Sequence, residues 1–81
     1  MDDRQILDQI KTLVDREHAA RQQAAQGLLG RDEEQAQIRD LERALDQCWD
    51  LLRQRRARQE FHQDPDDARP RPPQEIQDYR Q

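Results

Sequence analysis

The chain has 81 residues, of which 32% are hydrophobic and 40% are charged, so it is one small domain at most. Its net charge of −4 excludes a general polyanion binder, although charge can still segregate locally. No apolar stretch approaches the ~20 residues that span a bilayer, the start Met1-Asp2-Asp3 is unlike a signal sequence, and a lone cysteine excludes an internal disulfide, so we expect a cytoplasmic protein without membrane contact.

The first predicted element is a helix from about residue 3 to residue 26. Its apolar positions alternate in steps of four and three, which is the spacing of a helix that packs along one stripe. Asp2 or Asp3 is expected to stabilise its N-terminal end, and Gly27 is expected to end it. The stripe comprises Ile6, Ile10, Leu13, Glu17, Ala20 and Ala24.

A turn over residues 27–31 leads into a second helix, predicted from about residue 32 to residue 61. Asp32 is expected to cap it, with Gln35 completing a capping box. Leu28 and Leu29 in the turn are expected to cover the end of the helix pair, a protein-docking knob being the alternative. The second stripe comprises Ile38, Leu41, Leu45, Cys48, Leu52, Arg55 and Gln59.

If the chain folds back at this turn, residues whose numbers sum to 58 face each other, and Arg55 lies opposite Asp3. The predicted fold is therefore all-α, an antiparallel two-helix coiled-coil hairpin over residues 1–62. Residues 63–81 form a proline-containing tail with at most short helical turns. Asp64 is expected to cap one such turn, which begins at Pro65.

The apolar stripe widens toward the open end of the hairpin, where one partner helix cannot cover it. Trp49 and Leu51 flank the second stripe on opposite sides. We therefore expect self-association into a four-helix bundle. Two alternatives stay open: the tail folds back as a lid through Ile76 and Tyr79, or a different protein supplies the cover. The predicted partner interface comprises Leu7, Val14, Trp49, Leu51 and Leu52.

Four arginines crowd the end of the second helix, at Arg53, Arg55, Arg56 and Arg58. One interpretation is solvation or pairing within the chain, with Asp2 and Asp3 as candidate partners of Arg55. A second is contact with an acidic protein surface. A third is nucleic-acid or ribosome association through phosphate groups, although few aromatic residues accompany the arginines.

No spacing of chemistry-bearing residues predicts catalysis. His18 and His62 lie far apart on the proposed pairing, and with one cysteine they make no metal-binding pattern. Cys48 faces Ile10 and has no histidine neighbour, so an activated thiolate is not expected. We therefore expect no catalytic residue, no cofactor and no metal, and we predict a non-catalytic protein–protein interaction module.

One segment has the character of a family signature. It reads Leu45-Asp46-Gln47-Cys48-Trp49-Asp50-Leu51-Leu52-Arg53-Gln54-Arg55-Arg56-Ala57-Arg58. It resembles the signature of a small actinobacterial family catalogued as domain of unknown function 2630, and the likeness extends over nearly the whole chain, to the closing Tyr79 and Gln81. The resemblance implies a short cytoplasmic protein, and it carries no catalytic residue, cofactor or partner across to this chain.

Overall fold

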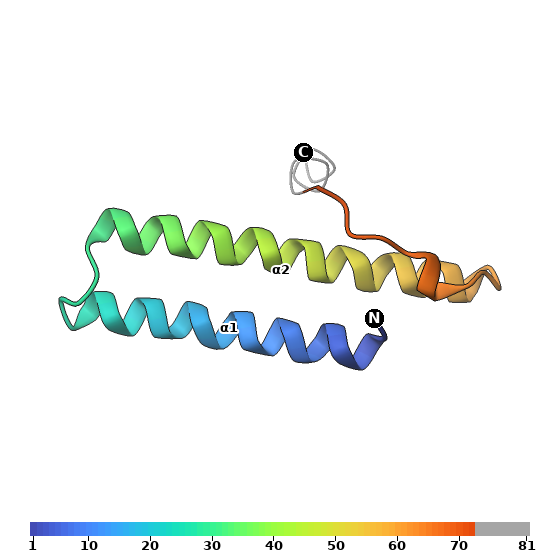
Figure 1. The fold of residues 1–81 in the computed structure, drawn as a ribbon, viewed down its shortest axis with the longest axis horizontal. Coiled ribbons are helices and arrows are strands. Elements are labelled where there is room, and N and C mark those ends of the chain that lie inside the picture. Colours follow the sequence, from blue (N-terminus) through green and yellow to red (C-terminus); the bar gives the residue numbers. More distant parts are fainter. Residues whose placement is uncertain (73–81) are drawn as a thin grey trace.

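The computed structural model describes residues 1–72 and shows two antiparallel helices lying side by side (Figure 1). Helix α1 spans Asp3–Ala25 and helix α2 spans Arg31–Glu60. A short 3-10 helix, η1, spans Pro65–Asp67. Residues 1–72 contain no strand, so the predicted all-α hairpin is confirmed.

Both ends of α1 follow from its sequence. The Asp2 carboxylate accepts the Gln5 backbone N–H at 2.8 Å, and the Gln5 side chain accepts the Asp2 N–H at 2.9 Å, which forms a capping box. At the other end Gly27 has φ +76°, and the next N–H, of Leu28, donates to the Gln23 carbonyl at 2.9 Å. This is a Schellman ending, whose left-handed residue is normally glycine, so Gly27 ends the helix as predicted.

The predicted cap of α2 is wrong. Gly30, in an extended conformation, occupies the cap position without a side-chain hydrogen bond, and its carbonyl accepts the Glu34 N–H at 2.9 Å. Asp32 is therefore the second residue of the helix, and the capping box expected with Gln35 does not form. The glycine pair completes the chain reversal within few residues, which lets the helix begin one residue before Asp32.

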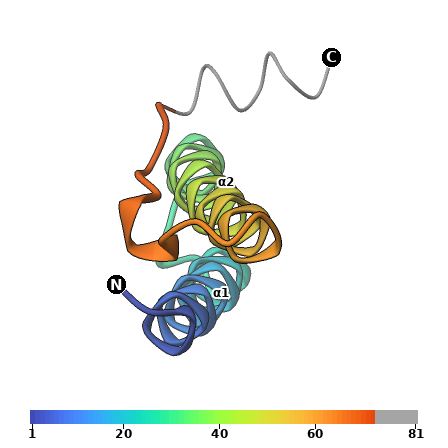
Figure 2. The same cartoon turned by 90° about the vertical axis from the view of Figure 1, so that its right-hand side faces the viewer.

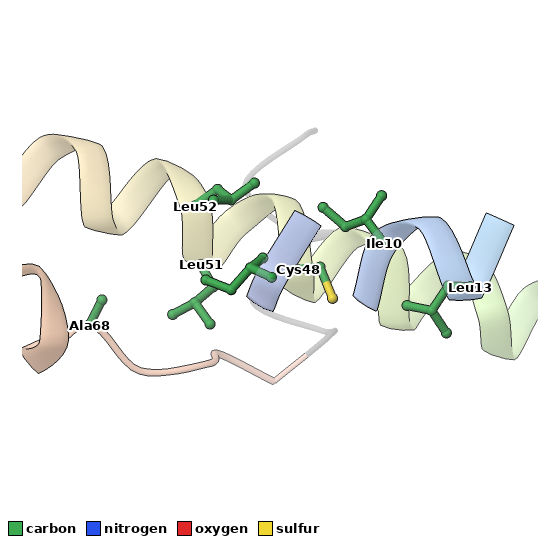
Figure 3. Close-up of a cluster of buried hydrophobic side chains, with 7 residues drawn as sticks. Ile10, Leu13, Cys48, Leu51, Leu52 and Ala68 are labelled. Atoms are coloured by element: carbon green, nitrogen blue, oxygen red, sulfur yellow. The ribbon is translucent and has the colours of Figure 1, made fainter. Parts of the chain in front are cut away.

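The register of the hairpin agrees with the predicted pairing. Arg55 Nε lies 2.6 Å from Asp3 Oδ1, and these residue numbers sum to 58. Between this ion pair and the middle of the hairpin lies the core, part of which is shown in Figure 3. The buried members are Ile6, Ile10, Leu13, Cys48, Leu51, Leu52 and Ala68. Nearer the turn, Ala20 is the one buried residue of α1, so the core is concentrated toward the open end.

Beyond α2 the chain reverses and runs back along that helix, as the orange segment of Figures 1 and 2 shows. His62, at φ 56°, makes the reversal, and Gln63 N donates to the Arg58 carbonyl at 2.7 Å. As predicted, Asp64 caps η1, accepting the Asp66 N–H at 2.9 Å, and Pro65 begins it. We call residues 63–72 the return segment. Ile76 and Tyr79, the lid predicted as an alternative, lie outside the described residues.

Candidate protein-interaction surface

The return segment covers one flank of the hairpin through a small apolar contact and several polar ones. Ala68 is buried in the core beside Leu51 (Figure 3). The Gln54 amide nitrogen donates to the Arg69 carbonyl at 2.8 Å, and the Gln47 amide nitrogen donates to the Arg71 carbonyl at 3.1 Å. Because glutamine side chains satisfy the backbone of the segment, that extended chain can lie against α2 without unpaired carbonyls at these positions.

Asp50 is the most deeply buried charged residue of the described chain, with 1% of its surface exposed. Arg71 donates two hydrogen bonds to its carboxylate, one of them 2.8 Å from Nε to Oδ2, and Gln54 donates another at 2.9 Å. The hydrogen bonds from Arg71 lower the pKa of Asp50 most strongly, although burial alone would raise it. The carboxylate is therefore held ionised, and the return segment is fixed to the outer side of α2.

Arg55 is also buried, with 6% of its surface exposed, and it connects three parts of the chain. Besides Asp3, its guanidinium donates to the Asp66 carboxylate at 2.9 Å and to the Pro65 carbonyl at 3.2 Å. The hydrogen bond to Asp3 raises the pKa of Arg55 most, followed by that to Asp66. Arg55, predicted as a possible contact for a polyanion or an acidic partner, instead pairs within the chain, and its pairing with Asp3 is the one that the first interpretation of the cluster expected.

Two residues of the predicted partner interface are buried. Leu52 is 3% exposed because it packs between the helices, and Leu51 is 8% exposed because the return segment lies over it. Figure 3 shows the Leu51 side chain directed toward Ala68, whereas the Leu52 side chain is not directed toward Ala68. Placing these two leucines on a free surface was wrong, since sequence periodicity did not indicate that residues 63–72 would supply the cover.

The other three residues of that prediction are exposed. The exposed fractions are 47% for Leu7, 37% for Val14 and 46% for Trp49. At 100° per residue, Leu7 and Val14 share one side of α1. Trp49 lies on the side of α2 opposite Leu51, hence away from the return segment, at a height between Leu7 and Val14. We call these three residues the apolar flank. In Figure 2 the described return segment lies on the other side of the helix pair.

The remaining arginines of the cluster stay near the surface. Arg53 and Arg56 are exposed and Arg58 is half-buried. Arg53 also lies 3.9 Å from the Asp50 carboxylate. The cluster is therefore divided, since Arg55 points into the molecule and its neighbours do not.

Sequence reasoning missed the residues that fix the return segment. The available signal was the spacing of Gln47, Asp50 and Gln54, which lie three and four residues apart and so form a polar stripe on one side of α2. That stripe lies on the side of α2 that faces away from the contact with α1, where side chains are ordinarily exposed to solvent. Nothing in its spacing indicates that Arg69 and Arg71 are the groups that meet it.

Other candidate sites offer little chemistry. Burial raises the pKa of the Cys48 thiol, which disfavours a reactive thiolate. A shallow groove of about 360 Å³ beside Ala20 and Leu41 is open to solvent. At the turn Leu28 is 74% exposed and Leu29 is half-buried, so only Leu29 partly covers the end of the pair. Within residues 1–72, no three histidine, cysteine or acidic side chains come together as a metal site.

None of the helices described is long and apolar enough to cross a membrane.

Comparison with known proteins identifies the family. The sequence model of the family described as "Protein of unknown function (DUF2630)" matches residues 2–81. The chain belongs to the DUF2630 family. The resemblance noted in the segment from Leu45 to Arg58 is thus confirmed over nearly the full length.

Uncharacterised mycobacterial proteins are similar to this chain. "Uncharacterized protein Mb0922c" of Mycobacterium bovis and "Uncharacterized protein Rv0898c" of Mycobacterium tuberculosis are each 46% identical to it over 77 residues. Each alignment covers 95% of this chain and 88% of the relative. No solved structure gives a significant match. Family membership therefore supports treating residues 2–81 as one unit, and it assigns no activity to that unit.

Proposed function

We propose that this protein is a non-catalytic protein–protein interaction module of the cytoplasm that self-associates through the apolar flank. The observation that carries the proposal is the unequal cover of the two sides of the hairpin. The return segment buries Leu51 on one side, whereas Trp49 on the other side remains 46% exposed. A free, buried cysteine, Cys48, fits a reducing compartment.

The gain from covering this flank is substantial for so small a protein. Leu7, Val14 and Trp49 are large side chains on a surface that is otherwise rich in charge. Burial of apolar area contributes about 25 cal/mol per Å², and a tryptophan brings the largest area of any side chain. A second hairpin laid on this flank would give a four-helix, coiled-coil-like arrangement, the geometry that such amphipathic pairs favour.

Nucleic-acid association through the arginine cluster is the weaker proposal. Arg55 is neutralised by Asp3 and Asp66 and is buried, so the cluster presents fewer free charges than its sequence suggests. Binding driven by phosphate contacts would weaken steeply as salt rises, whereas an apolar interface would not.

Trp49 is the one tryptophan of the chain and so reports directly on its own surface. We expect sedimentation equilibrium to show dimers between micromolar and submillimolar concentration, with tryptophan emission shifting to longer wavelength on dilution. Trp49→Ala should weaken the association at least about tenfold, since truncating a central aromatic typically costs 2 kcal/mol or more.

The matched control is Phe61→Ala, which removes an aromatic side chain that is 74% exposed and lies off the flank. It should leave the association unchanged. A wild-type protein that stays monomeric at 500 µM (a concentration on the order of a weak interface's dissociation constant), with emission independent of concentration, would rule the proposal out.

A further inference from the structure

We infer that the partner on the apolar flank is a second copy in a defined register, in which α2 crosses α2 of the partner antiparallel with the two Trp49 side chains adjacent at the two-fold axis. This inference rests on the proposed self-association and adds its geometry. It follows from the order of charges along one side of α2.

Glu42, Trp49 and Arg56 are spaced seven residues apart, so all three lie on the same side of α2. Glu42 and Arg56 are exposed, and neither forms an ion pair with another described residue. The stripe therefore reads negative, aromatic, positive, with the aromatic residue midway. At about 1.5 Å per residue, each charge is roughly 10 Å from the centre.

Such a stripe is complementary to itself after a half-turn. When two copies of α2 are laid face to face in opposite directions, Trp49 meets Trp49, and Glu42 of each copy meets Arg56 of the other. Both ends of the contact then carry one opposite-charge pair. A parallel arrangement of the two α2 helices would instead place Glu42 against Glu42 and Arg56 against Arg56, which like-charge repulsion disfavours.

Helix α1 fits the same axis. The pairing of Asp3 with Arg55 sets the register, which places Trp49 at the height of Gln9. Leu7 lies on one side of this height and Val14 on the other. The half-turn that overlays the α2 stripes therefore brings Leu7 of one copy to within about one helical turn of Val14 of the other. The apolar residues of both helices surround the axis, and the charges lie outside them, as in interfaces with an apolar centre and a polar rim.

The opposite flank offers no comparable arrangement among the described residues. There the return segment occupies α2 through Gln47, Asp50 and Gln54. A second copy can therefore approach the apolar flank without displacing residues 63–72.

Charge reversal tests the register in the full chain. Glu42→Arg alone and Arg56→Glu alone each create two like-charge contacts per dimer, because the axis repeats every contact. Each should weaken self-association roughly tenfold or more, and the double variant should recover to within about threefold of wild type.

The sharper measurement mixes the two single variants. In the mixed pair both contacts become favourable, so an equimolar mixture should form heterodimers although each variant alone is largely monomeric. Arg43→Glu, an exposed charge on a different side of α2 whose change in net charge equals that of Arg56→Glu, is the control and should not alter association. Circular dichroism establishes that each variant remains helical.

The outcomes separate this inference from the proposal on which it rests. A monomeric wild type overturns both. A wild-type dimer that Trp49→Ala disrupts, but for which neither the double variant nor the mixture restores association, overturns the register and leaves self-association standing. Heterodimer formation in the mixture supports both.

Discussion

The Arg55 guanidinium on α2 donates to the Asp3 carboxylate on α1 over 2.6 Å, joining residues separated by 52 positions in the chain. The same guanidinium also holds η1 through Asp66. One side chain thus links the first turn of α1, the last turns of α2 and the return segment. The Arg55 guanidinium therefore holds the two helices together at the open end of the hairpin, where no loop connects them.

Replacing Arg55 by Gln is expected to lower the free energy of unfolding by about 1–3 kcal/mol, because it removes charge-assisted hydrogen bonds from a buried site. The cost stays below that of an isolated buried charge because the Asp3 and Asp66 side chains are themselves 41% and 72% exposed and can be solvated. Urea unfolding followed by circular dichroism at fixed protein concentration measures the change. Arg43→Gln on the exposed surface is the control and should shift stability by less than about 0.5 kcal/mol.

Stability should fall in acid partly through Asp50. Its folded-state pKa lies below the ordinary value of 3.8, chiefly because Arg71 donates hydrogen bonds to the carboxylate. A depressed pKa stabilises the fold fully above the unfolded-state value, and this contribution is lost as the pH falls below about 4 through the folded-state pKa. Asp50→Asn should therefore be less stable at pH 7 and should lose less stability between pH 5 and 3, a window set around the ordinary carboxylate pKa.

Asp15→Asn, at an exposed position on α1, supplies the comparison for this pH series. Parallel stability curves for wild type and Asp50→Asn across that window would contradict the assignment of acid sensitivity to Asp50. Asp66, whose pKa is lowered by Arg55, adds to the wild-type slope in the same direction.

Gly27 and His62, the two residues of the described part of the chain with a left-handed backbone, make a reciprocal pair of predictions. Gly27, at φ +76°, ends α1, and His62, at φ 56°, ends α2 in the same kind of Schellman turn. Gly27→Ala should destabilise by about 1 kcal/mol through backbone strain alone, since no atom lies within 4 Å of the added Cβ. His62→Gly should stabilise by about 0.5–1 kcal/mol because it relieves the same strain. Opposite signs in thermal unfolding would confirm both assignments.

Cys48 should react slowly with a thiol reagent in the folded protein. Its side chain lies in the core beside Ile10, and burial raises the pKa of the thiol. Labelling should be at least about a hundredfold slower than in urea, where the thiol is exposed, because modification requires opening of the hairpin. Native labelling at the unfolded rate would show that the helix contact is not maintained in solution.

The heptad spacing predicted the hairpin and its register, because one apolar stripe on each helix has only one way to face the other. The Asp3–Arg55 pair follows from that register and was anticipated as a contact within the chain. The burial of Asp50 was not predictable from the same rule, since its position on α2 faces away from α1 and is normally solvated. Its partner, Arg71, lies in a segment without helical periodicity, so nothing local sets their alignment.

The candidate site was predicted in part for the same reason. Leu7, Val14 and Trp49 are exposed as expected, because within residues 1–72 the return segment lies on the other side of the helix pair. Leu51 was misplaced because it packs with Ala68 of the return segment, a small residue whose sequence context gives little sign of packing. Hydrophobic periodicity identifies contacts between helices. The docking of an extended segment depends instead on individual side chains, and these do not follow a periodic pattern.

The uneven distribution of the core also determines how the molecule opens. Ile6, Ile10 and Leu52 are buried toward the free ends of the helices. Near the loop that joins the helices, Ala20 is the one buried residue of α1. Fraying should therefore start at the linked end, the reverse of a hairpin that unzips from its tips. Amide protons of residues 34–41 should exchange with deuterium sooner than those of residues 48–55. The loop would then keep the two helices connected without holding them packed together.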